Sequence, residues 1–253
     1  TASHNPRQYN GYKVYWEDGG QMPPERADEI LKLIHQTEYR EAVPMDEKEA
    51  LDKGLLTMIG KDVDDAYVAC VEKLSISPEL IREMGDKLKI VYTPLHGSGN
   101  IPVRRVLSEV GFKNVYVVPE QEMPDPDFST VKVPNPEDPA ALAMALELQK
   151  KLGADVAFGT DPDCDRVGIA VLDGEGHVHG LTGNQIGCLL LNYILSRRQA
   201  QGTLPENAAA VKSIVSTEMA RAICADYGCA MVDVLTGFKF IAEKIEQFET
   251  TGE

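Results

Sequence analysis

Three aspartates alternate with other residues in the stretch 159–166, which has the sequence GTDPDCDR. In an extended segment, this alternation places Asp161, Asp163 and Asp165 on one side of the chain. Converging carboxylates repel one another unless a cation binds between them, and a hard divalent cation prefers such oxygen ligands. Arg166 follows directly, and a guanidinium makes bidentate contacts with phosphate oxygens. We therefore predict a divalent-metal site that also contacts a phosphoryl group, with a solvated acidic turn as the alternative.

An EF-hand calcium loop is another class of aspartate-rich loop to which this stretch can be compared. That motif requires glycine at its sixth position and glutamate at its twelfth. This sequence has Arg166 and Leu172 at those positions. The sequence therefore excludes an EF-hand loop at this place.

Two further patterns are better explained by loop and strand structure than by ligand binding. The stretch 97–99, Gly-Ser-Gly, follows a predicted strand like a dinucleotide fingerprint, but Pro102 stands where the third glycine is needed. His177 and His179 lie two positions apart on a predicted hairpin, with no third ligand nearby in the sequence. We expect ordinary loop structure for 97–99 and the adjacent His96, and exposed strand residues for the other two histidines.

The opening residues, TASHNPRQYNGYKVYW, carry a second group of chemically active side chains. Pro6 fixes its own φ and disfavours the helical region for Asn5, so Ser3 is expected on a rigid, exposed loop. A serine hydroxyl is a poor nucleophile without a neighbouring base or cation, and His4 and Lys13 are near enough in sequence to assist. On these residues alone, a simple turn is the more ordinary explanation.

The elements around residues 159–166, called the acidic loop below, alternate between strand and helix as in a parallel α/β sheet. In chain order, the sequence predicts a strand at 89–92, a helix at 103–110, a strand at 115–118, a helix at 140–152, a strand at 155–158 and a hairpin at 167–172 and 178–181. The acidic loop thus follows the third strand of the predicted sheet.

Helices precede this sheet, and a second series of strands and helices follows it. Apolar residues at helical spacing predict a helix from Pro23, and two more between 64 and 84 separated at Pro78, with Ser77 as a candidate cap. The later elements are a helix at 184–196, a strand at 211–215, a helix at 218–227, a strand at 231–234 and a helix at 238–248. Because two parallel strands cannot cover their own faces, we expect this last unit to be incomplete or to borrow its cover.

The composition is typical of a folded protein that binds neither nucleic acids nor membranes. The 253 residues carry a net charge of −15, whereas nucleic-acid binding needs an excess of basic residues. No apolar run approaches the roughly 18 residues of a membrane helix. The five cysteines form no CxxC pair, which favours free thiols in a reducing compartment, so we expect a cytoplasmic protein.

Taken together, the polar loops resemble those of one family, the α-D-phosphohexomutases, and most closely its bacterial α-phosphoglucomutase and phosphomannomutase members. TASHNP followed by NGYK is similar to the family's phosphoserine loop, and DPDCDR to its D-x-D-x-D-R metal loop. LTGFKF is similar to its sugar-facing T-G-aromatic loop. The order and rough spacing of the loops also match, and the resemblance covers essentially the whole chain.

The resemblance implies an α/β fold of consecutive mixed-sheet domains of the phosphohexomutase type. Residues 1–86 would be the C-terminal part of domain 1, residues 87–180 domain 2, and residues 181–253 the N-terminal part of domain 3. Family members have a longer first domain, a longer third domain with a further sugar-contacting loop, and a fourth domain that binds phosphate. We therefore expect an internal fragment that is inactive on its own. The sequence predicts no particular oligomeric state.

The resemblance also implies which residues hold the phosphoryl group and the metal. Ser3 would carry a phosphoryl group in the resting enzyme. One Mg²⁺ would be bound by Asp161, Asp163, Asp165 and an oxygen on Ser3. Arg166 would contact the same phosphoryl group.

Proton transfer and sugar binding would fall to other residues. By resemblance, Lys13 or His4 lowers the pKa of the sugar hydroxyl or shuttles its proton, and the sequence does not separate these two candidates. Thr236, Gly237 and Phe238 would contact the sugar.

The implied reaction interconverts hexose 1-phosphate and hexose 6-phosphate through a phosphoserine and a bisphosphorylated sugar, with glucose 1,6-bisphosphate as activator. Phosphopentomutase and phosphomannomutase are alternatives within the same family. A metal-dependent phosphatase is a further alternative, and it would need a water path to the phosphoserine that mutases keep closed. The last alternative is a non-catalytic metal-binding module.

Overall fold

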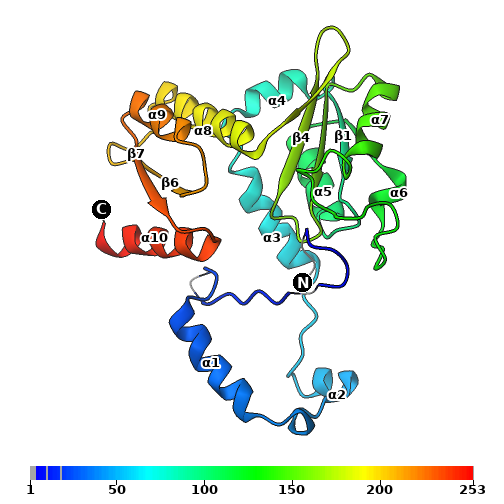
Figure 1. Ribbon diagram of the computed structural model, residues 1–253, viewed down its shortest axis with the longest axis vertical. Helices are drawn as coiled ribbons and strands as arrows, with labels where there is room; N and C mark the ends of the chain where they lie inside the picture. Colours follow the sequence, from blue (N-terminus) through cyan, green and yellow to red (C-terminus); the bar gives the residue numbers. More distant parts are fainter. Residues whose placement is uncertain (1–3, 10, 18, 253) are drawn as a thin grey trace.

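A computed structural model describes residues 4–9, 11–17 and 19–252 of the chain (Figure 1). Within these residues the chain forms a five-stranded mixed sheet and a separate two-stranded parallel sheet, each with helices packed against it. The predicted α/β fold with a mixed sheet is confirmed. No helix in the described part of the chain combines the length and the apolar character that crossing a membrane requires.

The larger sheet has the strand order β2-β1-β3-β4-β5. Its strands are β1 (Lys89–Thr93), β2 (Asn114–Val117), β3 (Val156–Thr160), β4 (Val167–Leu172) and β5 (Val178–Leu181). The first three are parallel, and β4 and β5 continue the sheet as an antiparallel hairpin. Both the predicted parallel series and the predicted hairpin are therefore present.

Helices connect the parallel strands and build the core of this unit. They are α5 (Asn100–Val110), the single turn α6 (Pro119–Glu122) and α7 (Ala143–Leu152). Helix α7 packs on β1 and β3, and α5 packs on β2. The central cluster joins Val91 and Ala157 of the strands to Ala145 of α7. The consecutive residues 90–92 of β1 are all buried, and this short β-prone run of Ile, Val and Tyr made the strand predictable.

Among the described residues, four α-helices precede this sheet. They are α1 (Pro24–Gln36), α2 (Glu47–Asp52), α3 (Lys61–Glu72) and α4 (Pro78–Met84), with a 3₁₀ turn, η1 (Tyr39–Glu41), after the first. The break before Pro78 is confirmed, and Ser77 occupies the N-cap position of α4 as predicted, but its side chain makes no capping hydrogen bond. Its buried hydroxyl instead accepts a hydrogen bond from Arg197 Nε at 2.9 Å, which joins this turn to the following unit.

The smaller sheet pairs β6 (Ala209–Ser213) with β7 (Ala230–Val234) in parallel. Its helices are α8 (Gly183–Ala200), α9 (Met219–Asp226) and α10 (Phe238–Thr251). Helix α9 packs on β7 and on α8, while α10 packs on β6. In Figure 1, the N-terminal segment (blue) runs below the loop end of the larger sheet toward α10. The five cysteines, which all lie within the described residues, are free thiols.

Candidate active site

The acidic loop after β3 is a tight turn rather than the extended segment that period-two spacing predicted. The N–H of Cys164 donates to the carbonyl oxygen of Asp161 at 2.9 Å, and Cys164 adopts a left-handed φ of 62°. The turn still gathers the predicted carboxylates, because Asp161, Asp163 and Asp165 each offer an oxygen within 4.8 Å of the others. The convergence was therefore predicted correctly but for the wrong geometric reason.

Asp161 is the most buried of the three carboxylates. It is 0% exposed, and its Oδ1 accepts the backbone N–H of Arg166 at 2.9 Å. Burial, reinforced by the neighbouring Asp163, raises the pKa of Asp161 to about 7.

Two carboxylate oxygens of the loop are well suited to hold a cation. Asp161 Oδ2 and Asp163 Oδ1 are buried and have no hydrogen-bond partner among the described residues. A buried oxygen without a partner is unfavourable, and coordination of a hard dication would satisfy both atoms. The donor set consists of oxygens only, so these residues fit Mg²⁺.

Lys13 connects the N-terminal segment to this loop across 150 residues of sequence. Its Nζ donates to Asp163 Oδ2 at 2.6 Å and to Asp165 Oδ2 at 2.8 Å. These hydrogen bonds raise the pKa of Lys13 above its usual value, so the side chain is an ammonium at neutral pH. Burial raises the pKa of Asp163, but the contacts with Lys13 and Asp161 together outweigh burial and leave that pKa below its usual value. Because Lys13 uses Oδ2, the other oxygen of Asp163 stays available to a cation.

The predicted nucleophile, Ser3, lies outside the described residues. His4 begins the described chain and is half-buried. Beyond it, Arg7 forms an ion pair with Asp127 of the loop between α6 and α7. Arg7 and Lys13 thus both place the N-terminal segment against the unit that carries the acidic loop.

Arg166 is placed differently from the other predicted site residues. Its backbone N–H supports Asp161, but its half-exposed guanidinium faces Glu137, with Nη1 3.9 Å from Oε2. The guanidinium contact with a phosphoryl group stays a prediction.

A cavity of about 490 Å³ joins the acidic loop to the predicted sugar loop. One wall includes Lys13 and Asp165, and the other includes Gly237, Phe238 and apolar residues of α10. Gly237 has φ 132°, which L side chains rarely adopt, and it is the N-cap residue of α10 at the cavity wall. Among the described residues, the exposed Thr236 does not contribute to the lining. The structure thus brings four of the predicted site residues to one cavity.

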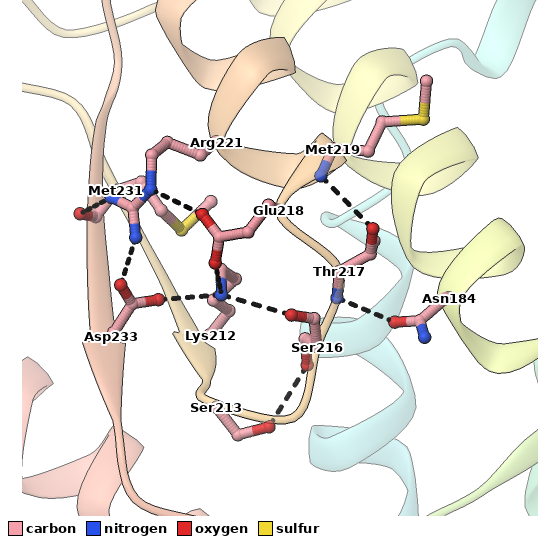
Figure 2. A network of polar contacts seen from close by, with 10 residues as sticks. All are labelled: Asn184, Lys212, Ser213, Ser216, Thr217, Glu218, Met219, Arg221, Met231 and Asp233. Carbon is pink, nitrogen blue, oxygen red and sulfur yellow. Dashed lines mark hydrogen bonds and ion pairs between the residues drawn. The ribbon is translucent and has the colours of Figure 1, made fainter.

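Ion pairs join β6 and β7 to the loop between β6 and α9, as Figure 2 shows. Lys212 Nζ lies 2.8 Å from Asp233 Oδ1 and 2.9 Å from Glu218 Oε1, and it donates to the carbonyl oxygen of Ser216 at 3.2 Å. Arg221 contacts the same two carboxylates. Both strands therefore share one network with the start of α9, close to the loop that carries Gly237.

Two residues that support the acidic loop had been interpreted only as loop structure. Ser98 donates from both its N–H and its hydroxyl to the carbonyl oxygen of Pro162, at 2.9 and 3.0 Å. A Cβ on Gly97 would lie 2.4 Å from Pro162 Cα, so only glycine allows this approach. The available signal was the glycine pattern after a strand, whose partner loop is more than 60 residues away.

Comparison with known proteins identifies the family of these loops. The model of Phosphoglucomutase/phosphomannomutase, alpha/beta/alpha domain I matches residues 1–41, that of domain II residues 65–174, and that of domain III residues 182–253. The phosphoglucomutase of Staphylococcus epidermidis is 37% identical over 246 residues, which are 97% of this chain and 43% of the relative. The chain therefore spans less than half the length of this curated relative.

Solved structures support the same fold. A putative phosphomannomutase from Thermus thermophilus superposes with a TM-score of 0.71 at 24% identity, over 98% of this chain and 50% of that one. The N-acetylphosphoglucosamine mutase of Aspergillus fumigatus, solved in complex with GlcNAc-6P and magnesium, gives 0.50 at 17% identity, over 74% and 38%. Because three successive domain models of one family match it in order, this chain belongs to the phosphoglucomutase/phosphomannomutase family.

Proposed function

We propose that this chain is part of a phosphoglucomutase-type enzyme that interconverts hexose 1-phosphate and hexose 6-phosphate. The observation that carries the proposal is the cavity with Lys13 and Asp165 on one wall and Gly237 and Phe238 on the other. A sugar phosphate in this cavity would meet the acidic loop and the sugar-facing loop at once. The division into 1–86, 87–180 and 181–253, one predicted polar loop in each part, belongs to the same proposal.

Asp161, Asp163 and Asp165 would hold Mg²⁺ together with an oxygen on Ser3. Bound there, the ion would supply positive charge that offsets the negative charge of the transferring phosphoryl group. Support comes from the two unpartnered buried oxygens and from the magnesium complex of the Aspergillus fumigatus relative.

Ser3 would be the phosphoryl carrier of a two-step exchange. Phospho-Ser3 gives its phosphoryl group to a free hydroxyl of the sugar phosphate, and the bisphosphorylated sugar returns the other one to Ser3. Glucose 1,6-bisphosphate would therefore phosphorylate any Ser3 that has lost its phosphoryl group and so act as activator. Arg166, one residue from Asp165, would turn from Glu137 toward the phosphoryl group.

Lys13 is the better supported of the two candidates for assisting the sugar hydroxyl. It is held as an ammonium by two carboxylates, and it lines the cavity. A cation at this place lowers the pKa of a nearby hydroxyl, which favours attack on the phosphoryl group. His4, next to Ser3 in the serine loop, is the alternative proton carrier.

We propose the identity of the sugar from sequence similarity, because the fold is shared by mutases that act on different sugars. Glucose phosphate is favoured by the 37% identity to a phosphoglucomutase, with mannose and pentose phosphates as family alternatives. Free thiols on all five cysteines support a cytoplasmic location, where sugar phosphates are also found.

A substrate panel on the complete protein tests the proposal. With Mg²⁺ and glucose 1,6-bisphosphate present, glucose 1-phosphate should turn over, and Ser3→Ala should abolish turnover. Turnover that survives Ser3→Ala would remove Ser3 from its role. Fast release of inorganic phosphate without sugar interconversion would favour a phosphatase instead. An unphosphorylated Ser3 together with no preference for divalent metal would favour a non-catalytic module.

A further inference from the structure

His96 lies in a chain of largely buried hydrogen bonds. This chain is between the acidic loop and the N-terminal stretch that carries Ser3, which we call the serine loop (residues 1–13). It is 6% exposed and adopts a left-handed φ of 63°. Its Nδ1 is 2.8 Å from the carbonyl oxygen of Met123, and its Nε2 is 2.7 Å from Thr130 Oγ1. A carbonyl can only accept, so Nδ1 carries the proton and Nε2 accepts from the Thr130 hydroxyl.

The chain continues into the core with consistent donors and acceptors. Gln121 Nε2 donates to Thr130 Oγ1 at 3.3 Å, and Gln121 Oε1 accepts from Thr93 Oγ1 at 2.6 Å. Thr93 Oγ1 in turn accepts the N–H of Leu95 at 3.2 Å. Thr93 and Gln121 are both fully buried. Every bond therefore has a defined direction, and replacing one partner leaves another buried group unsatisfied.

On one side, His96 supports the loop of residues 123–132, which the serine loop contacts. The ring of Phe128 packs edge-on against the His96 ring, with centroids 6.0 Å apart. Phe128 also lines a hollow of about 260 Å³ together with Pro6 and Arg7. The ion pair between Arg7 and Asp127 joins the same two loops.

On the other side, the residues next to His96 support the acidic loop. Gly97 and Ser98 follow it directly and contact Pro162, which stands between Asp161 and Asp163. Leu95 and His96 both have a positive φ. Such strained backbone persists where the surroundings fix it, and here the hydrogen-bond chain does so.

We propose that His96 is a positioning residue that fixes the 123–132 loop, and with it the serine loop, relative to the acidic loop. It acts through Thr130 and Phe128 on one side and through its own backbone at 97–98 on the other. This inference rests on the proposed function, since it assigns His96 to the alignment of the phosphoryl carrier with the metal carboxylates.

The test replaces Thr130 rather than His96, because Thr130→Val removes the hydroxyl at nearly constant volume and leaves the strained backbone unchanged. Thr130→Ser keeps the hydroxyl and is the matched control. In the complete protein, Thr130→Val should lower kcat by about 10- to 100-fold and leave KM for the sugar phosphate unchanged, while Thr130→Ser retains kcat. Because a smaller folded fraction would also lower the apparent kcat at constant KM, each variant is assayed well below its melting temperature and kcat is expressed per folded molecule.

Two further measurements complete the test. Because Asp127 and Thr130 act on the same loop, the loss in the double variant Asp127→Asn/Thr130→Val should be smaller than the product of the single losses. Hydrogen exchange of the Ser98 amide and of the 123–132 loop should become faster in Thr130→Val but not in Thr130→Ser.

The outcomes separate this inference from the proposed function. Wild-type kcat in Thr130→Val, or equal loss in Thr130→Ser, overturns the positioning role. If the wild-type protein shows no mutase turnover, the proposed function fails. Hydrogen exchange alone then tests whether His96 and Thr130 connect the 123–132 loop to Ser98. Unchanged exchange in Thr130→Val then overturns the inference.

Discussion

Lys13 Nζ and Asp163 Oδ2 lie 2.6 Å apart, although 150 residues of sequence separate them. The contact places the cation of the N-terminal segment at one oxygen of a carboxylate whose other oxygen is buried and unpartnered within the described chain. One aspartate can therefore serve an ammonium and a metal ion at the same time. This arrangement makes the roles of the two residues separable by substitution.

Asp163→Asn should weaken Mg²⁺ binding by at least about 10-fold, because it removes a charged ligand at a buried position. Isothermal titration of the complete protein with Mg²⁺ measures this directly. Asp226→Asn, an exposed substitution of the same chemistry on α9, is the matched control and should bind as wild type. Equal affinity in Asp163→Asn and the control would refute the metal assignment.

Lys13→Met should lower kcat while leaving Mg²⁺ binding intact. It removes the cation proposed to assist the sugar hydroxyl, so kcat should fall by about 100-fold or more. Mg²⁺ affinity should be retained or increased, because a positive charge beside the metal carboxylates is lost. Steady-state kinetics and titration on the same preparation check both statements. Lys113→Met, which removes an exposed lysine paired with Asp86, should change neither quantity. Wild-type kcat in Lys13→Met would contradict the role.

The pKa of Asp161 predicts how stability depends on pH when metal is chelated. Its folded-state pKa of about 7 is above the unfolded value near 4, so the folded state favours the protonated form. The stability that protonated Asp161 contributes to the folded state is fully present below about pH 4, and it is lost as the pH rises through about 7. In chelator, Asp161→Asn should therefore gain in melting temperature relative to wild type between about pH 5 and pH 8. A difference between the two proteins that does not vary with pH would count against this burial effect.

Lys212→Met should lower the melting temperature of the protein without changing Mg²⁺ affinity. Lys212 is 7% exposed and neutralises Asp233 and Glu218, which would face each other and the carbonyl of Ser216 without it. Lys244→Met on the exposed face of α10 is the control. Scanning calorimetry of the two variants makes the comparison. Equal melting temperatures would show that the network of Figure 2 is dispensable.

Local sequence patterns were sufficient to predict the five strands and the two longer helices of the larger unit, but not the single turn α6, which lies in a stretch predicted as loop. The buried strand β1 and the helix-forming run of α5 carry their structure in neighbouring residues, so propensity and periodicity detect them. Residues 140–142 were predicted as the start of α7, but they form turns before it. Such boundary differences are expected where helix ends depend on local hydrogen bonds.

Features that depend on long-range contacts could not be predicted. Cys164 gives no glycine signal for the left-handed turn that gathers the three aspartates. Ser77 has the pattern of a helix cap, but Arg197, 120 residues later, takes its hydroxyl. The support that Gly97 and Ser98 give to Pro162 likewise depends on a loop that is distant in sequence.

The central claim is that Ser3 and the three aspartates act on one phosphoryl group. The most direct measurement exposes the dephosphorylated complete protein to glucose 1,6-bisphosphate with Mg²⁺ and follows phosphorylation by peptide mass spectrometry. We predict rapid incorporation of one phosphoryl group at Ser3 in the wild type, and incorporation slowed by at least about 100-fold in Asp163→Asn. Incorporation at another residue, or at the same rate in Asp163→Asn, would contradict the claim.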